Sequence, residues 1–467
     1  MDAFCQVRTW RRAWRLGVTQ LLCLGRHTIT NLLCTSGRQG VDWSADYRLY
    51  SEDHWEPDRL FAVVMDNVLR RLPAGCPLVL AMDDTHLKKT GAHVPGVGYR
   101  RDPLSPKFHC NLMRAQRFLQ VSAPLYTSPG PGAARCIPVA YEHAPSVPHP
   151  GKSDPPEKWK EYRKRCKQEN LSTRGLDLLK RLRSRMNRAP HGSGRGMVVV
   201  VDGSYTNQTV LRGLPSGTVL VGRTRKDLSL FDPPAPRAEV GRQTHRRYGS
   251  PLPTPEQLRQ DANIPWQKVV AFAAGKLHEF EIKTLGPVLW KKVGWRTPLR
   301  LIVIRPLGYR LRKGSRLLYR QPAYLICTDP PMPLAEALQY YLWRWGIEVN
   351  HRDEKQIVGV GQAQVTNDLS AGRQPAFAVF SYALLLLAAA DTWGVNAIEE
   401  RLAVPKWRQN SSSPLSTQQI VQELRKEAWA YALNHLAEGF VNAAPDDTKP
   451  RLLRDELASA VLYGSAA

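Results

Sequence analysis

The spacing of hydrophobic and polar positions changes several times along the chain. Near the N-terminus, apolar side chains recur at close to helical spacing between Trp10 and Leu24. A second helical segment follows from Thr28 to Cys34, and Thr28 is placed to cap it. The pattern predicts that residues 1–75 are helical, either as a helix-turn-helix or as an ordinary small helical bundle.

Two short apolar runs indicate buried strands. Residues 77–82 are apolar and are followed by Asp83 and Asp84, and residues 196–201, mostly valine, are followed by Asp202. Short apolar runs with such boundaries are typical of central strands in an α/β sheet. Further extended segments are predicted at 118–126, 137–141 and 218–222. A charged helical region is expected over 157–185 and a short helix near 205–212.

The second half of the chain begins with a different composition. Residues 224–332 are rich in Arg, Pro and turn residues and hold β-like runs that include 269–273, 299–305 and 323–328, which predicts a β-rich insertion. A long amphipathic helix is expected over 334–359. An apolar helix over 375–393 follows, and we interpret it as buried in the protein because it is short for a membrane span and contains Asp391.

The expected organisation is an α/β protein in five parts. These are a helical N-terminal region (1–75), the first part of a core (76–223), the β-rich insertion (224–332), the second part of the core (333–395), and a C-terminal helical region (396–467) with a loop at 409–414 and a helix at 417–437.

The charge of the chain points to a polyanionic partner. Its 66 Lys and Arg residues against 41 Asp and Glu residues give a formal net charge of +25. The basic residues are spread along the whole sequence, which favours folded positive grooves over a basic tail. Nucleic acid is the first candidate partner and an anionic membrane surface the second. The N-terminal helical region is a candidate DNA-binding unit.

Three carboxylates occupy positions that suit catalysis. Asp84 is expected to end the first buried strand, Asp202 ends the second, and Glu348 lies on the amphipathic helix. Open α/β sheets place their sites at the carboxyl ends of strands, and carboxylates are the hard oxygen ligands that Mg²⁺ or Mn²⁺ prefers. Taken singly, either aspartate could be a turn residue, and the glutamate could be a solvated ion-pair partner.

One face of the amphipathic helix carries further candidate chemistry. Tyr341, Arg344, Glu348 and Lys355 fall within about 60° of one another on a helical wheel. Such a face could bind a metal through Glu348 and phosphates through Arg344 and Lys355. A polar solvent face, with Glu348 paired to Arg344 or Arg352, is the alternative interpretation.

The spacing of these four residues resembles the Tyr-x2-Arg-x3-Glu-x6-Lys signature of one group of cut-and-paste DDE transposases from bacterial insertion sequences. Residues 80–85 with 88–91 resemble that group's first catalytic strand, 198–202 its second, and 219–227 the strand after it. The resemblance covers roughly residues 77–395.

The resemblance implies an RNase H-like catalytic core interrupted by the β-rich insertion. Asp84, Asp202 and Glu348 would bind two Mg²⁺ ions, with Mn²⁺ as a substitute, for phosphodiester cleavage at transposon ends and joining of the 3′-OH to target DNA. Asp83 and Asp84 point to opposite faces of a strand, so only one can be the ligand. Asp84 is favoured because the metal-binding aspartate of the family is followed directly by threonine.

The resemblance also implies the partners. Tyr341, Arg344 and Lys355 would contact phosphates of double-stranded DNA at the terminal inverted repeats, and Arg223, Arg225 and Lys226 are further candidates for phosphate contact. A homodimer on paired ends is expected. Relatives that form a hairpin stack an insertion tryptophan on a flipped base, for which Trp266, Trp290 and Trp295 are candidates.

Two other functions remain open on the sequence. One is a different RNase H-like DNA nuclease, such as a resolvase or repair endonuclease, and the other is a transposase-derived DNA-binding protein without catalysis. The expected location is the bacterial cytoplasm, at the nucleoid and without a membrane association.

Overall fold

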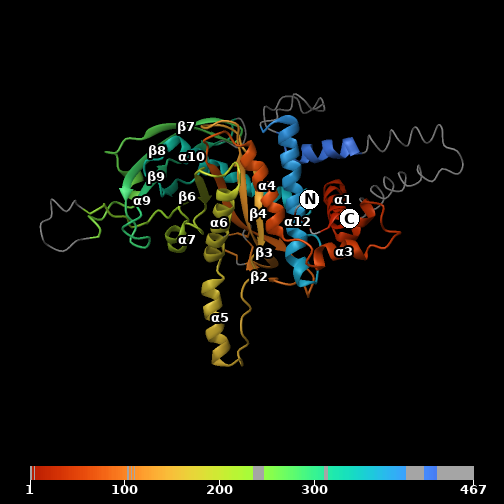
Figure 1. Ribbon diagram of the computed structural model, residues 1–467. Coiled ribbons are helices and arrows are strands. Elements are labelled where there is room, and N and C mark those ends of the chain that lie inside the picture. The colour runs from red at the N-terminus through yellow and green to blue at the C-terminus, as the bar shows by residue number, and fades with distance from the viewer. Residues whose placement is uncertain are drawn as a thin grey trace.

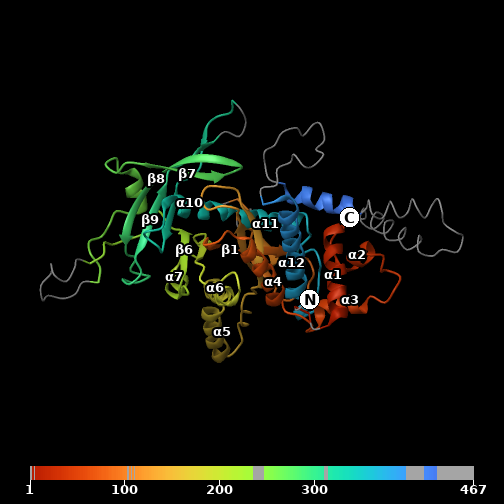
Figure 2. The same ribbon diagram turned by 45° about the horizontal axis from the view of Figure 1, so that its top comes forward.

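The structure is a computed structural model that describes residues 3–4, 6–102, 105–106, 108–109, 111–234, 247–309, 314–395 and 415–428. Most of its strands form one large sheet, and helices pack against it. The N-terminal helices lie at one end of the molecule and strands β7 to β9 at the other (Figure 1). The second view, turned by 45°, shows the same separation (Figure 2).

The strands are β1 Leu78–Lys88, β2 Gly98–Arg101, β3 Leu112–Leu125, β4 Arg135–His143, β5 Met197–Val201, β6 Thr218–Arg223, β7 Gln267–Ala273, β8 Lys276–Val288, β9 Leu299–Ile304, β10 Gly308–Tyr309, β11 Leu318–Tyr319 and β12 Ala323–Cys327. The helices are α1 Val7–Leu22, α2 Ile29–Thr35, α3 Ser44–Ser51, α4 Pro57–Arg71, α5 Pro156–Gln168, α6 Leu171–Arg188, α7 Gln208–Gly213, α9 Pro255–Gln260, α10 Leu334–Trp343, α11 Trp345–Gln356 and α12 Asp368–Trp393. Residues 417–428 are also helical.

The main sheet has ten strands in the order β2-β3-β1-β5-β6-β12-β9-β8-β7, with β4 paired to β3. Strands β1, β5 and β6 run parallel, and β3 and β4 are antiparallel to their neighbours. The fold is therefore a mixed α/β fold, and it is consistent with the RNase H-like core that the family resemblance implies.

The β strands of residues 224–332 continue this sheet. Strand β12 pairs antiparallel with β6, with Leu325 opposite Arg223, and β9, β8 and β7 follow in order. The runs expected at 269–273, 299–305 and 323–328 correspond to β7, β9 and β12. The apolar pattern does not predict strand β8, because the charged side chains of Lys276, Glu279, Glu281 and Lys283 interrupt it.

Strand β1 is longer than expected, which changes the place of Asp84. The strand runs on through Asp83 and Asp84 to Lys88 because β3 pairs with it as far as that residue. Asp84 therefore lies inside the strand and does not end it. Asp202 does follow directly after β5. The sequence predicts a strand end at Asp83 and Asp84 because charged residues rarely lie in a central strand, but here the neighbouring strand β5 ends alongside them.

The single helix expected over 334–359 is two helices, α10 and α11, which meet at Arg344. Arg344 itself has helical dihedral angles, φ −52° and ψ −32°, so the chain keeps a helical path through the junction. This preserves the side-by-side placement of residues one turn apart, and the hydrogen bond between Arg344 and Glu348 spans the junction.

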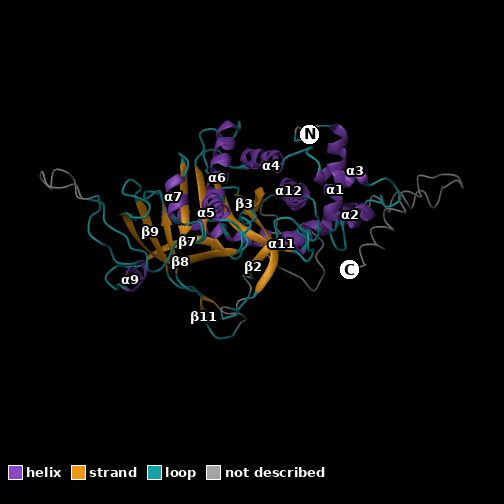
Figure 3. Cartoon of the chain, turned by 90° about the horizontal axis from the view of Figure 1, so that it is seen from below, coloured by secondary structure: helices purple, strands orange, loops and turns teal. Residues whose placement is uncertain are grey.

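The two faces of β1 meet different helices (Figure 3 shows helices on both sides of the orange strands). Asp83 pairs with Gln120 of β3, whose amide donates to Glu354 of α11 at 2.7 Å. On the other face, α6 approaches closely at Gly175, where an added methyl carbon would lie 3.2 Å from Met82. Residues with odd numbers between 81 and 85 therefore face α11, and those with even numbers face α6.

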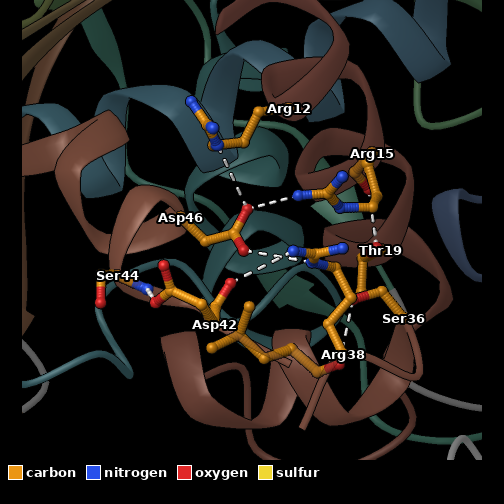
Figure 4. Close-up of polar contacts among 9 residues, drawn as sticks. Arg12, Arg15, Thr19, Ser36, Arg38, Asp42, Ser44 and Asp46 are labelled. Carbon is orange, nitrogen blue, oxygen red and sulfur yellow. Dashed lines mark hydrogen bonds and ion pairs between the residues drawn. The ribbon is translucent and has the colours of Figure 1, made fainter. Parts of the chain in front are cut away.

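The N-terminal helices α1, α2 and α3 form a small second core that packs on α12 through Phe377. Buried Asp46 of α3 joins them, because Arg12 and Arg15 of α1 and Arg38 all point at its carboxylate (Figure 4). The expected cap on α2 is confirmed, since the Thr28 hydroxyl accepts from the backbone N–H of Asn31. Helix α4 belongs instead to the main core.

Helix α12 is, within the part of the chain that the structure describes, the one helix long and apolar enough to cross a membrane. Most of its apolar stretch is buried by the protein itself, against α1, α3, α4 and β4. This agrees with its interpretation as a core helix. The loop expected at 409–414 and most of the C-terminal region 396–467 lie outside the described residues.

Candidate active site

Asp83 of β1 and Asp202, which follows directly after β5, come from neighbouring strands at the carboxyl end of β5. Met82 pairs with Val201, so the next residue of each strand is an aspartate. Burial, together with the negative charge of Asp202, raises the pKa of Asp83 to about 7. A carboxyl group whose ionisation is disfavoured by burial and by a neighbouring carboxylate offers a site for a positive charge.

Arg344 connects this pair to Glu348. Its Nη2 donates to Oε1 of Glu348 at 2.7 Å, and its Nη1 lies 3.9 Å from Oδ2 of Asp83. The guanidinium also lies 5.7 Å from the centre of the Tyr341 ring. The arginine is largely buried, so its guanidinium interacts with Asp83 and Glu348 in a site that is partly shielded from water.

Asp84 has its hydrogen-bond partner on the other face of the strand. The hydroxyl of Tyr205 donates to its Oδ1 at 3.3 Å, and Nε2 of His86 is 3.8 Å from its Oδ2. Burial raises the pKa of Asp84, and the nearby Arg117 lowers it. Burial, together with Arg100 and Arg117, lowers the pKa of His86 to about 4, so this imidazole is neutral at pH 7.

A cleft of about 800 Å³ runs alongside these residues, and both Asp84 and Glu348 line it. Lys355 and His351 of α11 form one wall, and Arg26 and Arg114 lie farther along. Burial lowers the pKa of Lys355. The cleft therefore joins the carboxylates to a path bordered by cations, which suits a phosphate backbone.

The three basic residues after β6 have different surroundings. Arg223 and Lys226 line a second cleft of about 530 Å³, together with Arg259 and Tyr324. The positive charge of Arg223 also acts on Tyr341, whose pKa is raised by burial and lowered by Arg344 and Arg223. Arg225 is exposed and pairs with Asp227 at 2.8 Å. The structure thus brings Arg223 toward the Tyr341 face and leaves Arg225 at the surface.

The insertion tryptophans differ in exposure. Trp266 lies beneath the ammonium of Lys283, 4.7 Å from the ring centre, and Trp290 packs against the main core. Trp295 is 43% exposed, with Arg296 over its ring. Trp295 is therefore the most accessible of the three candidates for stacking.

Sequence reasoning missed Tyr205 and Arg117 beside Asp84, and Gln120 beneath Glu354. Tyr205 follows Asp202 by three residues, a spacing that could have suggested that it bends back toward the carboxylates. Arg117 and Gln120 come from β3, and only the antiparallel register of β3 with β1 brings them near Asp84 and Asp83.

The donor set suits a divalent cation only in part. Asp83 and Asp202 offer adjacent hard oxygen ligands, while Glu348 is engaged with Arg344. Among the residues that the structure describes, no group of three or more His, Cys, Asp and Glu side chains is arranged to hold a metal ion. The pair Asp83 and Asp202 therefore fits the chemistry of a metal site, with Glu348 within reach of the same arginine.

The structure is an α/β fold with acidic residues on β1, after β5 and on α11. The family model described as "DDE superfamily endonuclease" matches residues 5–297, and the chain belongs to this superfamily. Membership indicates a nuclease or transposase type of activity, and enzymes of the superfamily generally use divalent metals. The match includes Asp83, Asp84 and Asp202 and ends before α10. No protein with a curated description matches the chain.

Proposed function

We propose that this protein is a DNA transposase that cleaves transposon ends and joins the freed 3′-OH to target DNA. The observation that carries the proposal is the link that Arg344 makes between Glu348 and Asp83, because it ties the signature residues of α10 and α11 to the acidic end of the parallel strands. Superfamily membership supports the cleavage step.

The proposed metal ligands are Asp202, Glu348 and one member of the Asp83–Asp84 pair. Bound Mg²⁺ would activate the attacking oxygen and stabilise the leaving one. The sequence favours Asp84, because threonine follows it, and Asp84 lines the cleft with Glu348. Strand alternation favours Asp83, which shares a face with α11 and neighbours Asp202. We propose that Asp83 is the ligand. Asp84, which the sequence favours, is the alternative ligand.

The basic and aromatic residues around the carboxylates are proposed to hold DNA. Lys355 borders the cleft beside Glu348, and Arg344 and Tyr341 lie at the turn between the two helices. The positive charges of Lys355 and Arg344 and the hydroxyl of Tyr341 would bind phosphate oxygens next to the scissile bond. These contacts would orient the scissile bond. Arg223 and Lys226 extend this surface toward the insertion, with Arg225 at its edge.

The proposed substrates are the terminal inverted repeats of a mobile element and its target DNA, held by a homodimer with one active site for each end. The positive charge spread along the chain supports a long DNA contact.

The test is excision of a marker placed between the DNA ends that flank the coding region, with wild type and Glu348→Gln compared in Mg²⁺. We expect excision and joining by the wild type, and no excision by the variant with DNA binding retained. Cleavage without joining would favour a resolvase-type or repair nuclease. Binding without any cleavage by the wild type would favour a DNA-binding protein that has lost catalysis.

A further inference from the structure

Helix α5 is an exposed arm on the surface of the protein. None of its thirteen residues is buried. It extends beyond the rest of the described chain at the lower side of the molecule (Figure 1), and the second view shows it below α6 and α7 (Figure 2). Because the helix buries no side chain, core packing does not stabilise it, and local contacts must order it.

Local contacts hold the arm in place. The ring of His149, in the segment after β4, lies 4.9 Å from that of Trp159 and 5.2 Å from that of Tyr162. Asp154 accepts from Lys158 at 2.9 Å near the start of the helix. At the other end, Asn170 caps α6 by accepting from the backbone N–H of Thr173. The arm therefore has an inner face, packed on the segment from β4, and an outer face.

The outer face of the arm is basic. Helix α5 carries six basic and two acidic residues. Lys160, Lys164 and Lys167 are exposed and fall within about 60° on a helical wheel, away from Trp159 and Tyr162. Among the described residues, no carboxylate lies within 4 Å of any of these three ammonium groups. The stripe therefore presents net positive charge to the solvent, since its three lysines outnumber Glu157, which lies at its edge.

The arm also starts from the end of the sheet that carries the acidic residues. Helix α6 begins beside the loop that follows β5, where Asn207 donates to the Ser172 hydroxyl at 2.8 Å. Asp202 opens that loop. Because α5 precedes α6 and extends away from it, the arm continues outward from the carboxyl end of β5, outside the cleft that Glu348 and Lys355 line.

We propose that α5 is a DNA-binding arm whose Lys160, Lys164 and Lys167 contact the phosphate backbone of duplex DNA outside the catalytic cleft. The arm is about 20 Å long, which covers roughly half a turn of B-form DNA. A membrane surface suits it less well, because its aromatic residues face the protein and no apolar stripe is left to enter lipid. The inference rests on the proposed function, since it assumes a DNA substrate at the acidic end of the sheet.

The test compares DNA binding by the full chain as wild type, as Lys160→Gln/Lys164→Gln/Lys167→Gln, and as a control with Arg70→Gln/Lys180→Gln/Arg188→Gln. The control residues are exposed, equal in number, and lie on α4 and α6 away from the arm. The probe is a linear duplex of arbitrary sequence in EDTA, titrated at several salt concentrations. Far-ultraviolet circular dichroism checks folding, which the arm variant should keep because α5 buries no residue.

We expect the arm variant to bind at least about tenfold more weakly and to lower the slope of log K against log salt by about 3, one unit for each lysine. The control should stay close to the wild type. Equal losses in both variants, or unchanged binding by the arm variant, would overturn the inference and leave the proposed function standing. A wild type that binds anionic vesicles of phosphatidylserine but no duplex would overturn both.

Discussion

Arg344 donates to Glu348 at 2.7 Å across the junction of α10 and α11, one turn along the helical path. The same guanidinium is 3.9 Å from Asp83, so a single buried cation is shared by acidic groups that come from a strand and a helix. This arginine fixes where the glutamate side chain stands and offsets the repulsion that gathered carboxylates would otherwise suffer.

Replacing Arg344 by lysine is expected to reduce DNA cleavage by about 100-fold, because lysine cannot reproduce the planar two-sided contact with Glu348 and Asp83. Single-turnover cleavage should fall, while duplex binding stays within about threefold. Equal losses in binding and cleavage would mean that the arginine acts through its proposed phosphate contact alone and does not position Glu348.

The matched pair Asp83→Asn and Asp84→Asn separates the two candidate ligands. We expect Asp83→Asn to reduce metal-dependent cleavage at least about 100-fold and Asp84→Asn to reduce it less than about tenfold. Both variants keep the side-chain shape, so DNA binding in EDTA serves as the folding control. The reverse order of losses would establish the sequence-based choice of Asp84.

Asp46 is expected to stabilise the N-terminal helices. Its carboxylate is 1% exposed and accepts from Arg15 and Arg38 while Arg12 lies 3.6 Å away. Asp46→Asn should lower the free energy of unfolding by about 2–4 kcal/mol, because the arginines lose their common counter-charge. Asp177→Asn, which breaks an exposed pair with Lys180, should change it by less than about 0.5 kcal/mol.

Thermal unfolding measures both aspartate variants. Limited proteolysis would then show cleavage first within residues 6–51 of the Asp46 variant, because α1 to α3 form their own core. Identical melting of Asp46→Asn and wild type would count against this role.

Glu354 should make stability depend on pH. Burial raises its pKa to about 8 from an ordinary value of 4.5, and Gln120 donates to it. In the folded protein the carboxyl stays protonated, whereas in the unfolded chain it ionises above pH 4.5. The stability that Glu354 contributes is therefore present in full below pH 4.5 and is lost as the pH rises toward 8.

Glu354→Gln, which mimics the protonated carboxyl, should show no such loss. Urea unfolding at pH 5 and pH 8 would show the variant gaining up to about 4 kcal/mol over the wild type at the higher pH. Two parallel pH profiles would indicate that Glu354 is ionised in the folded protein.

The sequence was informative where a local pattern determines structure. The valine run of β5 and the cap at Thr28 depend on neighbours in the chain, and both lie where they are expected. The apolar stretch 375–393 is helical as expected, but its helix α12 begins earlier, at Asp368, so that Pro375 lies inside the helix and does not open it. The four residues from Tyr341 to Lys355 also stay on one side of the helical path, because helical periodicity survives the turn at Arg344.

The sequence was less informative where distant strands meet. The end of β1 depends on β3, which keeps residues 83–88 in the sheet. The surroundings of Asp84 depend on Tyr205, whose position is set by the loop after β5, and on Arg117 of β3. Pairing register between strands is a tertiary property, and a single chain without its fold does not reveal it.

The pairing of β12 with β6 determines how the insertion could be studied. The insertion begins after β6 and ends with β12, the strand paired to it. The backbone N–H of Thr224 donates to the carbonyl oxygen of Tyr324 at 2.7 Å. Deleting the segment between them would leave an unpaired row of backbone groups along β6. Such an edge recruits strands from other molecules. A shortened protein would therefore tend to aggregate, and the insertion is better probed by point substitution than by truncation.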